Sequence, residues 1–117
     1  MLLRMKALTE GARSLLYLAA SNVDRARLGE DGARTRVDLL TPLAKAYGTD
    51  IGCEVASIGI QIHGGMGFIR DFDLNLWYRR VASWSLRGGT AAEHRRTIAA
   101  ALLDQPGKVR IGSIPQQ

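Results

Sequence analysis

The sequence predicts an all-α fold, an up-and-down helical bundle of three to four helices. Apolar and small residues recur at intervals of three and four over two long stretches, which is the spacing of one helix face. Glycine-rich breaks at 29–32, 64–67 and 88–89 divide the chain into segments of helical length. No segment alternates apolar and polar residues in the way that a half-buried strand does.

The first helix is expected from residue 2 to about residue 28, because its apolar or small residues fall at positions 5, 8, 12, 15, 16, 19, 23 and 26. The second is expected to begin at Thr41 and Pro42, with Thr41 as the N-cap. Proline suits the first helical position, where its missing N–H has no partner in any case. The apolar stripe of this second helix continues to Ile62. Two such helices joined by a short polar link should pack antiparallel.

A third, shorter helix is expected over residues 72–84, with Trp77 and Trp84 on one face as core or interface anchors. Thr90 can cap a last helix over residues 91–103. The folded domain is therefore predicted to span residues 1–104, and residues 105–117, which lack any periodicity, are predicted to be a flexible tail.

Composition narrows the possible classes of function. The net charge is +5, but the arginines are scattered rather than grouped with aromatic residues, which does not favour nucleic-acid binding. No apolar run is long enough to cross a bilayer, so a cytoplasmic protein without a membrane partner is expected. Cys53 is the only cysteine, and with His63 and His94 it lacks the spacing of metal ligands, so no metal site is predicted. Cys53 is interpreted as a small core residue, His63 as a neutral helix-end residue and His94 as a solvated one.

The run from Gly64 to Gly67 is the most informative local pattern. Glycines end a helix cheaply, and they also allow a ligand phosphate to approach backbone N–H groups closely. On glycine spacing alone, a simple helix end is favoured over a phosphate-binding site. No strand precedes the run and no Lys-Ser/Thr pair follows it, so it is not a nucleotide-binding fingerprint.

The full string from Gln61 to Ile69, Gln-Ile-His-Gly-Gly-Met-Gly-Phe-Ile, resembles the Gln-x-x-Gly-Gly-x-Gly-Tyr/Phe segment of acyl-CoA dehydrogenases. The segments 1–13, 38–46 and 51–60 are similar to the methylmercaptopropionyl-CoA dehydrogenase-like subgroup of that family. The resemblance covers residues 1 to about 104. It implies a C-terminal helical domain without its opening helix and without the two domains that precede it in a complete enzyme.

The resemblance implies a flavoprotein that oxidises an acyl-CoA thioester between its α and β carbons with FAD as cofactor. Gln61, Gly64 and Gly65 would approach the adenosine–pyrophosphate half of a neighbouring subunit's FAD, and Thr90 matches a threonine that contacts the cofactor. The family also implies a homo-oligomer. The absent opening helix that the resemblance implies supports the same expectation, because a bundle without its first helix should leave an apolar groove that favours self-association.

One segment departs from the family pattern. Where most members read Ile-Tyr-Glu-Gly-Thr, this chain reads Leu-Arg-Gly-Gly-Thr over residues 86–90. The usual catalytic glutamate falls on Gly88, so no catalytic residue is assigned. Two interpretations stay open: the C-terminal domain of a flavin-dependent acyl-CoA dehydrogenase, inactive as an isolated chain, or a non-catalytic binding and oligomerisation module derived from that family.

Overall fold

The computed structural model describes residues 1–103, and this part of the chain contains helices and no strand. The helices are α1 (Leu2–Arg27), α2 (Ala33–His63), α3 (Gly65–Phe68), α4 (Leu74–Trp84) and α5 (Ala91–Leu103). The all-α prediction is confirmed. The flexible tail predicted at 105–117 lies outside the described residues.

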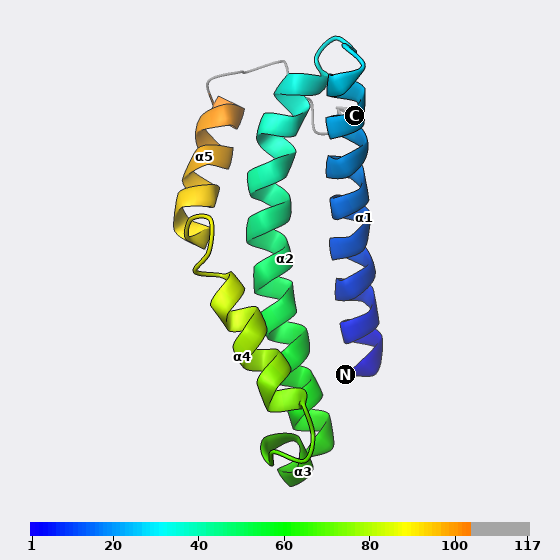
Figure 1. Ribbon diagram of the computed structural model, residues 1–117, viewed down its shortest axis with the longest axis vertical. Coiled ribbons are helices and arrows are strands. Elements are labelled where there is room, and N and C mark those ends of the chain that lie inside the picture. The colour runs from blue at the N-terminus through cyan, green and yellow to red at the C-terminus, as the bar shows by residue number, and fades with distance from the viewer. Residues whose placement is uncertain (104–117) are drawn as a thin grey trace, which may run out of the picture.

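Helix α2 is the centre of the structure (Figure 1). Helix α1 runs antiparallel to it on one side, while α4 and α5 follow one another along the other side. Every described helix packs on α2, and the only other packed pair is α3 with α4. The up-and-down order is therefore correct, but the described helices form an open row in which α1 touches neither α4 nor α5.

The α1–α2 pair forms as predicted, and polar groups reinforce it at the connecting turn. Asn22 is 3% exposed although it is polar. Its side-chain nitrogen donates to the carbonyl of Leu18, and its oxygen accepts a 2.7 Å bond from Nε of Arg36 on α2. Arg36 also donates to Glu30 in the turn, at 2.7 Å. A buried amide with both ends bonded fixes the register of the two helices.

The predicted start of α2 is wrong. The helix begins at Ala33, directly after Gly32 in the left-handed region (φ 70°), and Pro42 lies inside it. An internal proline removes one helical hydrogen bond and costs roughly 3 kcal/mol. The helical turns between Ala33 and the predicted start offset this cost, since they bury Ala33 completely and bring Arg36 to Asn22. The cap signal at Thr41 was thus overridden by tertiary packing.

The contact between α2 and α4 is very close at one point. A Cβ built on Gly52 would lie 2.6 Å from Cγ1 of Val81, so only glycine fits beneath this valine. The rest of the core is thin: its buried apolar residues are Ala19, Ala33, Ala46 and Ile51. Trp77 and Trp84 are about half exposed, so they are not the core anchors of the described part, and the interface reading of both remains a prediction.

Candidate functional site

The glycine break at residues 64–67, called the first break from here on, ends α2 and begins α3 at the lower end of the molecule (Figure 1). Gly64 takes a positive φ of 56°, which glycine adopts without strain, and its N–H bonds back to the carbonyl of Gln61 at 3.1 Å. A short α3 helix follows where the sequence predicted only a turn. His63 directs Nδ1 to the carbonyl of Gly59 at 2.9 Å, in keeping with a helix-end role.

The glycines of this break divide into two kinds. A Cβ built on Gly67 would lie 2.7 Å from the carbonyl oxygen of Ile60, so Gly67 is required by packing. A Cβ on Gly64 or Gly65 would meet nothing within 4 Å. These two glycines and Gln61 are exposed, which leaves their backbone open to a ligand. A flavin cofactor's pyrophosphate fits such a surface, because it needs close approach to backbone groups and an amide donor.

The second break joins α4 to α5. Lys45 of α2 donates from Nζ to the carbonyl of Trp84 at 2.6 Å, and the same carbonyl accepts a 3.2 Å bond from the Arg87 N–H of the loop. Gly88 and Gly89 then turn the chain with φ of 71° and 99°. The loop is therefore held at its start by a cation from the central helix.

Thr90 begins α5 with a reciprocal cap. Its N–H and its hydroxyl both donate to Oε2 of Glu93, at 2.6 and 3.0 Å, and the Glu93 N–H returns a 3.3 Å bond to the Thr90 hydroxyl. These bonds, the backbone one first and the hydroxyl second, lower the pKa of Glu93 below its ordinary value, with smaller help from the charges of Arg96 and His94. The predicted cap is confirmed, and Glu93 serves as a capping residue.

His94 differs from the solvated residue that the sequence predicted. Its Nε2 is buried without a hydrogen-bond partner, and a Cβ on Gly89 would lie 3.2 Å from it. The ring packs against the glycine turn because nothing larger than glycine occupies position 89. No spacing rule reveals this contact, which depends on how the loop folds back over α5.

No unpaired carboxylate takes the place of the missing glutamate in the described hollow beside Gly88. The hollow beside Gly88 is lined by residues of α2, α5 and the loop: Arg34, Val37, Asp38, Thr41, Pro42, Lys45, Gly88, His94 and Thr97. Its single carboxylate belongs to Asp38, which lies 3.6 Å from the guanidinium of Arg34. Glu93, the nearest carboxylate along the chain, is occupied by the Thr90 cap.

The predicted cofactor residues do not form one pocket. Gln61, Gly64 and Gly65 lie beyond one end of α4, and Thr90 follows its other end. The 11 residues of α4 separate the two places by about 16 Å at the helical rise per residue. Each break can therefore contribute only an edge of a binding site.

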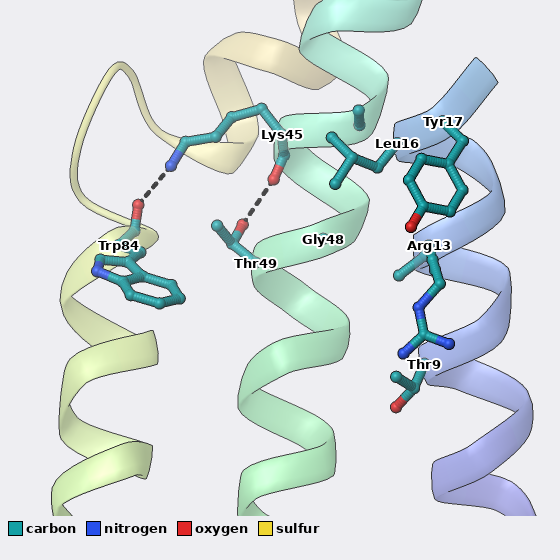
Figure 2. A pocket seen from close by; sticks show the side chains of 10 residues that line it. Thr9, Arg13, Leu16, Tyr17, Lys45, Gly48, Thr49 and Trp84 are labelled. Carbon is teal, nitrogen blue, oxygen red and sulfur yellow. Dashed lines mark hydrogen bonds between the residues drawn. The ribbon is translucent and has the colours of Figure 1, made fainter. Parts of the chain in front are cut away.

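An open groove of about 480 Å³ lies between α1, α2 and the end of α4 (Figure 2). Its lining includes the small residues Ala12, Ala44 and Gly48. Leu16 and Tyr17 lie on one side of the central helix and Trp84 on the other. Thr9, Arg13, Lys45 and Thr49 complete the lining. This is the apolar groove that the sequence predicted.

Two other kinds of site, a membrane-spanning helix and a metal centre, are not found within residues 1–103. No described helix combines the length and apolar character needed to span a membrane. The same residues contain no group of three or more histidine, cysteine, aspartate and glutamate side chains able to hold a metal ion.

Comparisons with known proteins show the family of this chain. Residues 1–103 match the family described as acyl-CoA dehydrogenase, C-terminal domain. The chain is 43% identical to 3-methylmercaptopropionyl-CoA dehydrogenase of Ruegeria pomeroyi over 96 residues, which are 79% of this chain and 16% of that protein.

More distant relatives show the same partial coverage. The chain is 29% identical to caffeyl-CoA reductase-Etf complex subunit CarC of Acetobacterium woodii, over 88% of this chain and 25% of the relative. It is 31% identical to butyryl-CoA dehydrogenase of Syntrophomonas wolfei, over 62% of this chain and 13% of that protein. The chain thus spans a quarter or less of these relatives. No solved structure matches it significantly.

Proposed function

Since the chain belongs to the acyl-CoA dehydrogenase family as its C-terminal domain, we propose that it is the helical part of a flavin-dependent acyl-CoA dehydrogenase-like oxidoreductase. In the full assembly, the reaction is the α,β-dehydrogenation of an acyl-CoA thioester. The other domains, on this or another chain, supply what residues 1–103 lack. We also propose a cytoplasmic location and self-association through the helical bundle.

The observation that carries the proposal is the open first break. Gln61, Gly64 and Gly65 have the family's motif spacing, and no side chain covers the two glycines. When bound, FAD supplies the acceptor for the hydride that leaves the β carbon. In this chain, the backbone of Gly64 and Gly65 and the Gln61 amide would hold its adenosine–pyrophosphate half, and Thr90 would contact it from the second break.

We propose that the isolated chain is catalytically inactive. Glycine at position 88 offers no group to take an α proton, and the one carboxylate that lines the hollow beside it, Asp38, is paired with Arg34. A carbon acid of this kind needs a positioned and desolvated base. An acyl-CoA substrate with an artificial electron acceptor should give no turnover above the rate without protein.

The first test is titration with FAD, followed by the fluorescence of Trp77 and Trp84. The proposal predicts saturable binding at micromolar FAD. Gly65→Leu should weaken it at least tenfold, because a Cβ at this position meets no protein atom within 4 Å and the added side chain would cover the backbone. Ala20→Leu, an exposed position on α1 away from the break, is the matched control and should leave binding unchanged.

A second candidate function is a non-catalytic binding or oligomerisation module derived from the same family. The glycine at position 88 and the exposed groove favour it. Absence of FAD binding up to millimolar concentrations would contradict the flavoprotein proposal for this chain. The non-catalytic module would then be the remaining candidate function.

A further inference from the structure

A hollow of about 580 Å³ lies where α5 packs against the first half of α2, beside the loop of the second break. From α2 it is lined at positions 34, 37, 38, 41, 42 and 45, which recur at intervals of three and four along one face of the helix. His94 and Thr97 line it from α5, and Gly88 lines it from the loop. None of the proposed flavin contacts lines this hollow, so it is a separate place in the molecule.

The hollow contains one positive charge without a counter-charge. Nζ of Lys45, a half-buried residue, donates to the Trp84 carbonyl at 2.6 Å (Figure 2). An ammonium group has three N–H donors, so this bond leaves two of them available. No carboxylate of residues 1–103 forms an ion pair with Lys45. Asp38, in the same hollow, lies 3.6 Å from Arg34, so these two charges balance each other and the charge of Lys45 remains.

The space beside this ammonium group exists because residue 88 is glycine. Apart from its chain neighbours, a Cβ built on Gly88 would have one atom within 4 Å, Cε of Lys45 at 4.0 Å. A side chain at this position would therefore begin beside the end of the lysine side chain, and glycine leaves that part of the hollow unfilled. Its positive φ of 71° also favours glycine. Free space and an uncompensated charge thus occur at the same place.

We infer that the hollow binds the anion of a short-chain monocarboxylic acid. The carboxylate accepts hydrogen bonds from the two available donors of Lys45, and the alkyl part contacts Val37, which is half-buried, and Pro42, which is buried. The single positive charge matches a single negative charge. A doubly charged phosphate is less suitable, because Asp38 lines the same hollow and like charges repel at short range. The inference goes beyond the proposed function and depends on no flavin chemistry.

The test is an NMR titration of the isotope-labelled chain with sodium acetate, propionate and butyrate at neutral pH, with sodium chloride as the control for ionic strength. The expected result is saturable shifts of the Gly88 and Gly89 backbone amides, with a Kd on the order of 1–10 mM. Each added methylene should strengthen binding by up to about fourfold, because it leaves water for the surface of Val37 and Pro42.

Three outcomes of this titration would overturn parts of the inference. Absence of saturable shifts up to about 100 mM propionate would exclude the site. Sodium phosphate that binds as tightly as propionate, or more tightly, would exclude a carboxylate site in favour of a general oxyanion site. Equal affinities for acetate and butyrate would exclude the placement of the alkyl part against Val37 and Pro42.

Lys45→Gln tests the charge. Glutamine keeps an N–H donor for the Trp84 carbonyl but carries no charge, so propionate binding should weaken by about tenfold or more while circular dichroism shows the same helix content. The matched control is Lys6→Gln, which removes the same charge at an exposed position of α1 outside the hollow and should change binding by less than about twofold. Equal effects of the two substitutions would show that only net charge matters and would overturn the site.

Gly88→Asp tests the space without changing Lys45. Aspartate tolerates a positive φ better than most residues, and its carboxylate would begin beside the lysine and take the place of the bound anion. Propionate binding should therefore weaken by about tenfold or more. Gly88→Asn is the matched control, because asparagine has the same shape without the charge and the hollow has room for both groups, so binding should weaken by less than about threefold. Equal losses in the two variants would overturn the ion pair as the basis of binding.

Discussion

The two glycine breaks of the candidate site end helices in different ways. The first, at residues 64–67, depends on packing, because Gly67 fits under the Ile60 carbonyl while Gly64 and Gly65 stay uncovered. The second, at residues 86–90, depends on hydrogen bonds, from Lys45 to Trp84 and between Thr90 and Glu93. The first break thus leaves Gly64 and Gly65 uncovered by side chains, although the Gly64 N–H and carbonyl bond to Gln61 and Gly67, whereas the second break is held by bonds from the side chains of Lys45 and Glu93. Glycine content alone does not distinguish a binding loop from a structural turn.

The sharpest contrast lies within the first break. Gly67→Ala should destabilise the protein by about 2 kcal/mol, because its Cβ would press on backbone atoms of Ile60 that cannot move away cheaply. Gly65→Ala is the matched control two residues away. Its Cβ meets nothing, so the free energy of unfolding should change by less than about 0.5 kcal/mol. Urea denaturation of both variants measures the difference, and equal effects would contradict the division into packed and open glycines.

A smaller effect is expected at the second break. Thr90→Ala removes the hydroxyl that exchanges bonds with Glu93, and loss of such a cap costs about 1 kcal/mol. Thr97→Ala is a suitable control, since its hydroxyl bonds only to the carbonyl of Glu93 within the helix. The cap would be unimportant if urea midpoints of the two variants coincided.

The smallest effect is a pH dependence at the same cap. Bonds from Thr90 lower the pKa of Glu93 in the folded chain, so its contribution to stability is complete above the ordinary carboxyl pKa. The contribution is lost as the pH falls through the lowered folded value. The difference in stability between wild type and Glu93→Gln should therefore be smaller at pH 3 than at pH 7. A difference that is the same at both pH values would show that the carboxylate charge contributes nothing.

Most of the fold was predictable from local patterns. The apolar stripes of α1 and α2 gave their antiparallel pairing, and Thr90 marked the start of α5 correctly, because a cap and its helix are adjacent in sequence. The signal at Thr41 and Pro42 failed because burial of Ala33 and the bonds of Arg36 stabilise earlier turns. Such compensation depends on a partner helix, which no local pattern contains.

The sequence predicts candidate residues for the site, and this assignment remains a prediction, but the sequence does not predict how these residues lie in space. The motif identified Gln61, Gly64, Gly65 and Thr90, yet their separation by the length of α4 follows only from the structure. The buried face of His94 and the bond from Lys45 to Trp84 were missed as well. Both are contacts between residues far apart in sequence or across a folded loop, and no spacing in this chain indicates them.

The central claim is that the first break, and not the packed part of the chain, is open to a flavin cofactor. The most direct measurement is the change in backbone amide NMR shifts during titration with FAD. The account predicts that the amides of Gly64 and Gly65 shift most and that Gly52, packed under Val81, does not move. Absence of shifts at Gly64 and Gly65 at saturating FAD, or larger shifts elsewhere in the described helices, would contradict it.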